Sequence, residues 1–416
     1  MDGKNSRIYL DYAATTPTDG AVFEVMKPYF SEKYGNASSV HSFGQESAAA
    51  VVRARHQVAE FLNCQPNEII FTSGATEGNN AIIKGIGASR LLAKKIGGQV
   101  HIIVSAIEHE CVKAAAEFLA KQEIAAVTFL PVNKDGVIQI AELERSIKPN
   151  TVLVSIMYAN NEVGTIQSIA QISELLKKIN QNRENKILFH TDAVQAINYL
   201  DCDVQKLGVD FLTLSGHKFY GPKGVGVLYV RNGAKFDKFM HGGEQEFHLR
   251  SGTHNTPGIV GLGEAISLVK KNSAHNKDLQ ALRDRLINGI QQKISHAFLN
   301  GPADSRLPNN VNFRFEGVEG EAILVSLDLE GVAVSTGSAC AAKSLEPSYV
   351  LLALGLNHLD AHSAIRFSLG RYTTEAEIDR VLEVLPPIIE RLRGISGNIK
   401  GDRLVEHGEL PKDFGC

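Results

Sequence analysis

Short apolar runs alternate with stretches of helical periodicity between residues 60 and 230. Several runs are rich in β-branched residues and almost continuously apolar, which is typical of strands covered on both faces. The predicted strands are Val100–Ser105, Val127–Leu130, Thr151–Tyr158, Ile187–Thr191, Phe211–Leu214 and Gly226–Val230. This alternation predicts an α/β domain with a mainly parallel sheet, in which ligands bind where loops leave the carboxyl ends of the strands.

The clearest helix in this region is Ser168–Asn180. Its apolar residues recur at steps of three and four positions, so they share one helix face. Ser168, followed three residues later by Gln171, predicts a capping box at the start of this helix.

The pattern changes after about residue 260. A long helical run, Val260–Ser295, is followed by turn-rich sequence, three short strands and a final helix. The strands are Val311–Phe315, Val332–Ser335 and Ala364–Ser368, and the helix is Glu375–Arg393. We therefore expect a second, smaller α+β domain, followed by a polar and poorly ordered tail, Gly394–Cys416.

Composition and charge exclude several classes of protein. The chain has 416 residues, of which 44% are hydrophobic and 21% charged, as in ordinary soluble proteins. A net charge of −3 gives no support for binding to nucleic acid or to an anionic membrane. The chain has neither the apolar run of about 20 residues that a membrane span needs nor an apolar secretory signal, so a cytoplasmic location is expected.

The five cysteines do not indicate a disulfide framework or a metal site. Their number is odd and none forms a Cys-x-x-Cys pair, so no structural zinc is expected. They are Cys64, Cys111, Cys202, Cys340 and Cys416. One of them remains a candidate for a reactive thiol.

Candidate chemistry begins at two predicted strand ends. Lys218 follows the apolar run ending at Leu214, and Asp192 ends the run that contains Phe189. A lysine partly removed from water loses proton affinity and becomes a Schiff-base nucleophile. An acidic residue at a neighbouring strand end could pair with the ring nitrogen of a pyridoxal cofactor. Taken alone, the lysine also fits a surface loop, and the aspartate also fits a helix N-cap.

A third candidate is the small-residue turn Thr72–Asn80, which follows a short predicted strand, Glu68–Phe71, and opens a helix. Free backbone N–H groups and the positive end of the helix dipole suit a phosphate there, with the Thr76 hydroxyl as a further donor. The turn has neither of the glycine patterns of nucleotide-binding loops. A plain helix cap remains the alternative.

Together these segments resemble the class V aminotransferase superfamily of fold-type I pyridoxal-phosphate enzymes, and more narrowly the cysteine desulfurases of the NifS/IscS type. The resemblance covers nearly the whole chain, and its specificity comes from the shared order and spacing of the motifs. These are Tyr9–Pro17, Gly35–Ser39, Ser73–Asn80, Glu108–His109, Asn160–Gly164, Asp192–Gln195, Ser215–Gly224, Arg250–Thr253, Ser335–Cys340, Leu345–Val350 and Ile365–Arg371.

The resemblance implies an α/β protein of the pyridoxal-phosphate-dependent transferase fold type I. Residues 16–260 would form the large cofactor-binding domain with a mainly parallel sheet. Residues 1–15 and 261–393 would form the small α+β domain that carries the catalytic cysteine loop, and 394–416 the polar tail.

The resemblance also implies roles for individual residues. Lys218 would carry pyridoxal 5'-phosphate as a Schiff base, Asp192 would pair with its ring nitrogen, and Gln195 would bind its phenolic oxygen. His109 would stack on the ring and is available to handle a substrate proton. The substrate carboxylate would be held by Arg366 and Asn161. Asn161 would also contact the cofactor. The phosphate would be bound by Ala75, Thr76, Ser215 and His217, and by Thr253 of a neighbouring subunit, which implies a homodimer.

Cys340 is the cysteine that the resemblance makes the nucleophile. It lies in Ser335–Lys343, a run of small residues that suits a mobile loop better than a packed strand. Attack on sulfur needs a thiolate with access to its target. Cys111 and Cys202 lie near apolar or helical sequence and are interpreted as buried structural thiols. Cys64 and Cys416 have no catalytic context.

The implied reaction converts L-cysteine to L-alanine and leaves a persulfide on Cys340. The sulfur would pass to an acceptor protein, either an iron–sulfur scaffold or a sulfur carrier. A selenocysteine lyase or another class V aminotransferase-like enzyme is the alternative. The sequence departs from the family by a longer polar loop, Asn180–Asn185. Residues 401–416 do not match an acceptor-docking tail, so the resemblance leaves the acceptor open.

Overall fold

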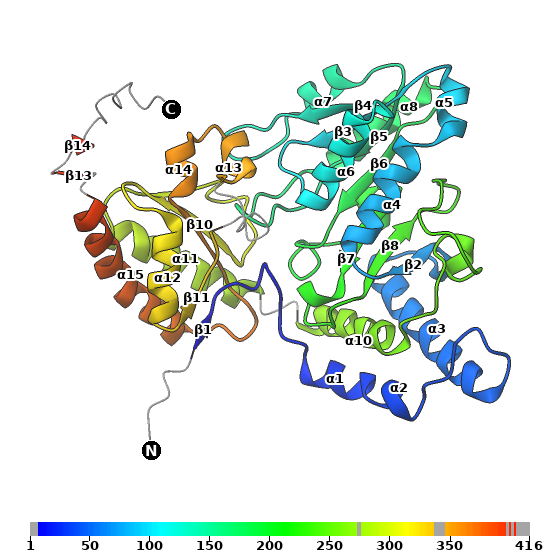
Figure 1. The fold of residues 1–416 in the computed structure, drawn as a ribbon, viewed down its shortest axis with the longest axis horizontal. Helices are drawn as coiled ribbons and strands as arrows, with labels where there is room; N and C mark the ends of the chain where they lie inside the picture. The colour runs from blue at the N-terminus through cyan, green and yellow to red at the C-terminus, as the bar shows by residue number, and fades with distance from the viewer. Residues whose placement is uncertain (1–6, 273–275, 337–345, 397–398, 401–402, 405–416) are drawn as a thin grey trace, which may run out of the picture.

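The computed structural model describes residues 7–272, 276–336, 346–396, 399–400 and 403–404. A seven-stranded sheet organises the larger part of the molecule, on the right in Figure 1. Its strands, in spatial order, are β2 (Ile69–Thr72), β8 (Gly226–Val230), β7 (Phe211–Ser215), β6 (Leu188–Asp192), β5 (Thr151–Ser155), β3 (Val100–Ser105) and β4 (Ala125–Leu130). Only β8 runs antiparallel to its neighbours in this sheet, so the prediction of a mainly parallel sheet is confirmed.

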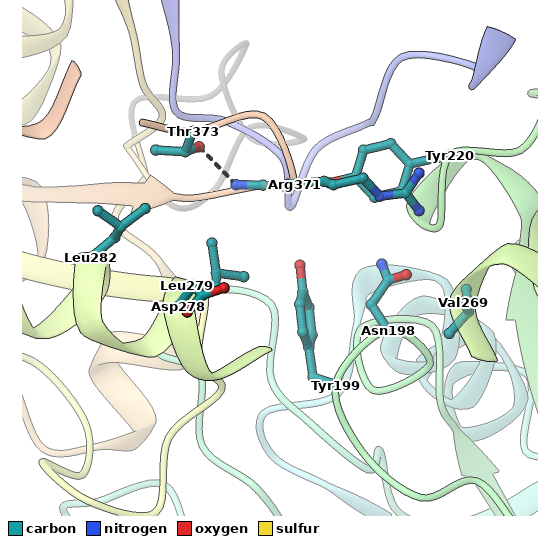
Figure 2. Close-up of a pocket in the computed structure, with 10 residues that line it drawn as sticks. Asn198, Tyr199, Tyr220, Val269, Asp278, Leu279, Leu282, Arg371 and Thr373 are labelled. Atoms are coloured by element: carbon teal, nitrogen blue, oxygen red, sulfur yellow. Dashed lines mark hydrogen bonds between the residues drawn. The ribbon is translucent and has the colours of Figure 1, made fainter. Parts of the chain in front are cut away.

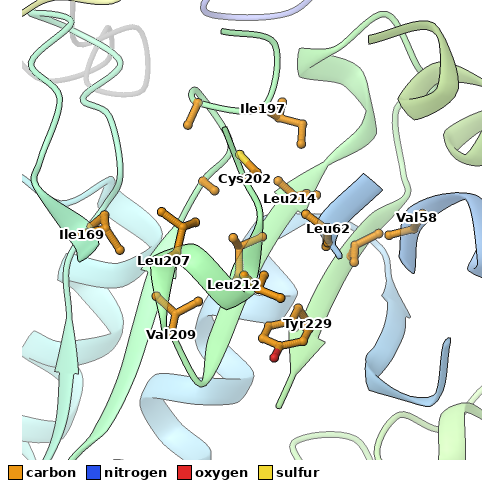
Figure 3. Packing of buried hydrophobic residues seen from close by; sticks show 14 of the residues in the cluster. Val58, Leu62, Ile169, Ile197, Cys202, Leu207, Val209, Leu212, Leu214 and Tyr229 are labelled. Carbon is orange, nitrogen blue, oxygen red and sulfur yellow. The ribbon is translucent and has the colours of Figure 1, made fainter. Parts of the chain in front are cut away.

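Helices cover both faces of this sheet, as the apolar character of its strands requires. In β3, Ile102 and Val104 pack into one apolar cluster and Ile103 into the other. The first cluster is closed by α4 (Ala75–Gly87) and α6 (Glu110–Lys121). The second is closed by α1 (Gly20–Met26), α3 (Ser42–Leu62), α8 (Ile169–Gln181) and α10 (Thr256–Asn272). Figure 3 shows part of the second cluster, in which Val58 and Leu62 of α3 lie beside Leu214 and Tyr229 of the sheet.

Shorter elements complete this part of the chain. The helices are α2 (Pro28–Ser31), α5 (Arg90–Ile96), α7 (Ile140–Ser146) and α9 (Val204–Leu207), and the 3-10 turns are η1 (Pro66–Glu68), η2 (Gly216–Lys218) and η3 (Glu246–His248).

The predicted capping box of α8 is wrong, because the Ser168 side chain makes no capping hydrogen bond and its backbone, with ψ of 66°, is not extended. Instead Gln167 anchors the helix start by donating to the Gly136 carbonyl.

A three-stranded antiparallel sheet forms the centre of the smaller part, in the order β12 (Ala364–Ser368), β10 (Asn310–Phe315), β9 (Ala297–Leu299). Its apolar cluster joins α11 (Asn276–Lys293), α12 (Gly320–Leu329) and α15 (Glu375–Ser396). The other elements are β1 (Ile8–Tyr9), β11 (Val332–Ala333), α13 (Tyr349–Ala353), α14 (His358–His362), β13 (Ile399–Lys400) and β14 (Arg403–Leu404). The predicted α+β character of this part is confirmed.

The predicted long helical run Val260–Ser295 is two helices rather than one. Helix α10 ends at Asn272 and α11 begins at Asn276. The two helices bury their apolar faces in different cores, since Leu262 and Ile266 belong to the large-sheet cluster while Leu286 and Ile290 belong to the small one. The domain limits at residues 15 and 260 remain a prediction.

Two further observations concern the helices. The final helix continues to Ser396, so the first residues of the predicted tail are helical. Across the part of the chain that the structure describes, none of the helices combines the length and apolar character needed to cross a membrane.

The packing of the large sheet can be tested at Gly226, where two backbone segments approach each other closely. A β-carbon at Gly226 would lie 2.6 Å from the Gly74 Cα and 2.6 Å from the Leu214 carbonyl oxygen, both of them backbone atoms. We expect Gly226→Ala to lower the free energy of unfolding by about 1–3 kcal/mol through overpacking, measured by urea denaturation. Gly98→Ala is the control, since nothing lies within 4 Å of a β-carbon there. Equal stability of the two variants would contradict the observed packing.

Candidate active site

The carboxyl ends of β6 and β7 bring Asp192 and Lys218 to one edge of the large sheet. Asp192 is the last residue of β6 and is 5% exposed. Strand β7 pairs with β6 in parallel, and the 3-10 turn η2 that follows it ends at Lys218. The two residues that the sequence placed at neighbouring strand ends therefore do occupy such ends.

The segment of residues 11–16 crosses this edge and contacts several predicted site residues. Its carbonyl groups accept hydrogen bonds from the Lys218 amine, at 2.6 Å to Ala13 and 2.8 Å to Ala14. The Gln195 side-chain amide donates to the same Ala13 carbonyl at 3.0 Å. Lys218 and Gln195 are therefore held at one place by the N-terminal part of the chain.

His217 is attached to the same segment. Its Nδ1 lies 3.1 Å from the Thr15 hydroxyl, and its carbonyl accepts a hydrogen bond from the Thr16 N–H at 2.9 Å. Burial, together with the neighbouring Lys218 charge, lowers the pKa of His217 to about 4. The imidazole is therefore neutral at physiological pH and can donate one hydrogen bond without carrying charge.

The first turn of α4 forms an anion-binding geometry beside the strand ends. Gly74, with φ of 154°, precedes Ala75, and the helix start has no side-chain cap. Ser215, at the end of β7, approaches this turn, because a β-carbon on Gly74 would lie 3.6 Å from the Ser215 Oγ. Thr76 is exposed in the same turn. Backbone N–H groups and two hydroxyl groups thus gather at the positive end of a helix dipole.

His109 caps the start of α6, with its Nδ1 accepting a hydrogen bond from the Cys111 N–H at 3.2 Å. The Cys111 Sγ lies 3.0 Å from the same nitrogen. Burial lowers the pKa of His109 even though the Asp192 charge acts in the opposite direction. The lowered pKa favours the neutral imidazole of His109, although Asp192 and Lys218 both lie close enough to influence it.

Arg366, on β12 of the smaller part, is the most buried of the predicted site residues that the structure describes. It is 2% exposed, and one terminal nitrogen pairs with Asp11 at 2.7 Å. The other donates to the Asn161 carbonyl at 3.1 Å. Its buried Nε finds no partner among the described residues. A buried guanidinium with an unused donor fits a carboxylate ligand.

Comparison with known proteins agrees with this geometry. The Aminotransferase class-V family model matches residues 8–381. A relative named cysteine desulfurase IscS, from Clostridium botulinum, is 50% identical over 395 residues, which cover 94% of this chain and 96% of the relative. The chain belongs to the cysteine desulfurases of the class V aminotransferase family.

Solved structures support the same assignment. A NifS-like protein superposes with a TM-score of 0.84 at 37% identity, covering 93% of this chain and 100% of the other. The structure entitled SspA in complex with cysteine has a TM-score of 0.76 at 37% identity, covering 88% and 100%. The predicted fold, the pyridoxal-phosphate-dependent transferase fold type I, is therefore confirmed.

One predicted residue of this desulfurase chain, Thr253, lies apart from the strand-end cluster. Thr253 is exposed, in a loop that the Gln245 side chain stabilises by accepting from the Gly252 N–H at 3.0 Å. Cys340 lies outside the described residues. The part of the chain before it is tied to the site, because Ser335 exchanges backbone hydrogen bonds with Arg366.

The described cysteines differ in their surroundings. Cys202 is fully buried in the large-sheet core, as predicted. Burial raises the pKa of the Cys64 thiol to about 12. Cys111 packs only partly against the core, and its Sγ contacts both His109 and Asn79. The interpretation of Cys111 as a purely structural thiol is therefore incomplete.

Sequence reasoning missed Asp11 and Asn79. Asp11 pairs with Arg366, and Asn79 donates a hydrogen bond to Asp192 at 2.6 Å. Both lie inside segments that match the family, but neither residue type by itself indicates a role. Only the tertiary pairing shows what they contact.

A separate pocket is lined by residues from both parts of the molecule. Figure 2 shows the side chains of Asn198 and Tyr199 pointing toward Arg371 and Tyr220. Asn198 also donates to the Lys218 carbonyl at 2.8 Å. The pocket is lined by none of the predicted catalytic or binding residues, so it adjoins the site without forming it.

The ion pair of Glu77 with Arg250 clamps the start of α4 to the Thr253 loop. The Arg250 Nε lies 2.8 Å from a Glu77 oxygen, and the Ser73 N–H donates to the other oxygen at 2.8 Å. Burial alone would raise the pKa of Glu77, but the hydrogen bonds from Arg250 and Ser73 outweigh it and hold the pKa below its usual value. This carboxylate therefore stabilises the folded protein in its ionised form.

We expect Glu77→Gln to lower the free energy of unfolding by about 1.5–3 kcal/mol at neutral pH, because hydrogen bonds to a charged group are lost. The contribution of a carboxyl group with a lowered pKa is complete above its unfolded pKa and disappears as the pH falls through its folded pKa. The difference from the unmodified protein should therefore shrink below about pH 4.3. Urea denaturation at several pH values measures it. Glu60→Gln, which removes an exposed pair with Lys270, should have little effect.

Proposed function

We propose that this chain is a pyridoxal-phosphate-dependent cysteine desulfurase that converts L-cysteine to L-alanine and transfers the sulfur to Cys340. The observation that carries the proposal is the placement of Lys218 and Asp192 at adjacent strand ends of a sheet of this fold. The 50% identical relative named cysteine desulfurase and the related structure containing cysteine support the choice of reaction and substrate.

The donor set fits pyridoxal 5'-phosphate. The phosphate would be held by the first turn of α4 with Ala75, Thr76, Ser215 and His217, where a neutral imidazole and free N–H groups donate. Asp192 has one oxygen bound by Asn79 and the other by the Val194 N–H at 3.0 Å. These contacts fix the orientation of the carboxylate at the sheet edge, where it would pair with a protonated ring nitrogen.

Lys218 and Gln195 complete the cofactor site. Lys218 would bind the cofactor aldehyde, and Gln195 its phenolic oxygen. The bound cofactor would supply an electron sink for the electrons released at the substrate α-carbon. Both side chains now bind carbonyl groups of the 11–16 segment, so that segment sets their approach to the cofactor.

The substrate carboxylate would be bound by Arg366 and Asn161. The unused Arg366 Nε provides a donor in a buried position, where a charged hydrogen bond is strongest. Lys218 would then remove the α-proton of the substrate at its Nζ. His109 would face the substrate from the start of α6.

Cys340 would take the sulfur atom. Its thiolate attacks the substrate sulfur, the carbon–sulfur bond breaks, and a sulfur–sulfur bond forms on Cys340, leaving alanine. Sulfur transfer to an acceptor protein, an iron–sulfur scaffold or a sulfur carrier, completes the cycle. This role rests on the family motif Ser335–Cys340.

We also propose that the enzyme is a homodimer. Exposed aromatic residues lie on α1, on α2, in the segment after α2 and at the start of α3, along the lower edge of Figure 1. They include Phe23, Phe30, Tyr34 and Phe43, each more than half exposed. Such a group of large apolar side chains is typical of an interaction surface. The exposed Thr253 would reach the phosphate of the partner subunit.

The role of Lys218 is tested by its removal. The purified protein should be yellow, and Lys218→Ala should lose the absorption band of the covalently bound cofactor and at least about 100-fold of its desulfurase activity. Lys223→Ala, a lysine five residues later in the same loop, is the control and should retain the band. A colourless protein that does not respond to added pyridoxal phosphate would overturn the proposal.

The role of Cys340 is tested by a change that spares the cofactor site. Cys340→Ala should keep the colour and the binding of cysteine but lose sulfide release in the presence of dithiothreitol. Cys64→Ala should keep all three. Full desulfurase turnover by Cys340→Ala would show that the nucleophile is wrongly assigned, and formation of a keto acid in place of alanine and sulfide would indicate an aminotransferase.

A further inference from the structure

A network of hydrogen bonds connects five buried side chains next to the proposed cofactor site. The residues of this network are Ser155, His190, Thr213, Asn79 and Asp192. The Thr213 hydroxyl donates to the Asn79 side-chain oxygen at 2.5 Å, so the Asn79 amide nitrogen must face the other way. That nitrogen lies 2.6 Å from the Asp192 carboxylate, which can only accept. The orientation of Asn79 is therefore fixed at both ends.

The second amide hydrogen of Asn79 forms a hydrogen bond to the Cys111 sulfur. The Asn79 nitrogen lies 3.1 Å from the Cys111 Sγ. Burial raises the pKa of Cys111 to about 12, so the sulfur carries its proton at physiological pH. A neutral thiol that accepts one hydrogen bond still has its own proton to donate. Two other side chains approach it in the described structure: His109, whose Nδ1 lies 3.0 Å away, and the Thr76 hydroxyl, which also hydrogen-bonds the thiol.

The contacts of His109 determine which ring nitrogen carries the proton. The Cys111 backbone N–H lies 3.2 Å from Nδ1 and can only donate, so Nδ1 is an acceptor. The Cys111 thiol approaches the same nitrogen and can donate to it as well. A neutral imidazole with an unprotonated Nδ1 carries its proton on Nε2, the nitrogen on the far side of the ring.

We propose that Cys111 is a positioning residue for His109, and that Asn79 holds it in place from the Asp192 side. The thiol and the N–H of Cys111 together keep His109 as the neutral tautomer with the proton on Nε2. His109 is then a proton donor toward the substrate, not a base, when the substrate enters. The proposed function is needed only for the statement that His109 acts in the reaction, because the tautomer is a property of the protein.

The same contacts couple two groups that are far apart in the sequence. Asn79 uses one amide hydrogen for Asp192 and the other for Cys111, so a shift of the carboxylate reaches the thiol through a single side chain. Because Asn79 and Asp192 are buried, water cannot replace a lost hydrogen bond between them at low cost. The protonation of His109 and the orientation of Asp192 are therefore linked.

The tautomer can be measured directly in the complete, cofactor-loaded protein. Nitrogen-15 labelling of the histidine rings, with His109→Gln to assign the signal, distinguishes the two neutral tautomers and the imidazolium by NMR. We expect the tautomer with hydrogen on Nε2 at neutral pH. A signal from a protonated Nδ1, in either the neutral or the charged ring, would overturn the inference.

The thiol is tested by a matched set of variants. Cys111→Ala should shift the His109 Nδ1 signal and lower kcat about tenfold, the rate equivalent of one hydrogen bond, while KM for cysteine changes less than about twofold. Cys111→Ser keeps a donor and an acceptor at this place and should restore most of both. Cys202→Ala removes a buried thiol elsewhere and should change neither.

The outcomes separate this inference from the proposed function. An unchanged His109 signal and unchanged kcat in Cys111→Ala would refute the positioning role, even if the protein is a desulfurase. A protein without desulfurase activity that nevertheless shows the Nε2 tautomer, with its Nδ1 signal shifted in Cys111→Ala, would refute the function and support the arrangement described here.

Discussion

The 2.6 Å hydrogen bond between Asn79 and the Asp192 carboxylate is the contact on which the site depends. Asn79 and the Val194 N–H each donate one hydrogen bond to a different oxygen of this buried carboxylate, and so fix its orientation. Asn79 lies on α4, whose first turn provides the anion-binding geometry. One helix therefore fixes both the charged end and the phosphate end of the proposed cofactor site.

The site also needs both parts of the chain. Asp192 and Lys218 come from the large sheet, whereas Arg366 comes from β12 of the small sheet. The segment of residues 11–16 contacts both, because Asp11 pairs with Arg366 and the carbonyl groups that follow bind Lys218. A short stretch of backbone thus connects the proposed substrate-binding residue to the proposed cofactor-binding residue.

Much of this could be predicted from the sequence. The strands of the large sheet were predicted because each is apolar on both faces, and Lys218 and Asp192 because they follow such strands. The break between α10 and α11 was not predicted, since helical periodicity does not show that Ile266 and Ile290 enter different cores. Asn79, Cys111 and Asp11 were missed as site residues because their contacts join positions from about 30 to more than 350 residues apart. The family motifs supply Cys340, which local chemistry alone leaves as one cysteine among five.

The attachment of the N-terminal segment has a consequence for protein synthesis. The Ala13 N–H donates to the Ser368 hydroxyl at 2.9 Å, and the Ser368 N–H donates to the Leu10 carbonyl at 2.7 Å. Ala13 therefore meets this partner only after a further 355 residues have been synthesised. A nascent chain can complete its large sheet early, but the ion pair of Asp11 with Arg366, and the attachment of this segment to β12, form only after β12 has been made.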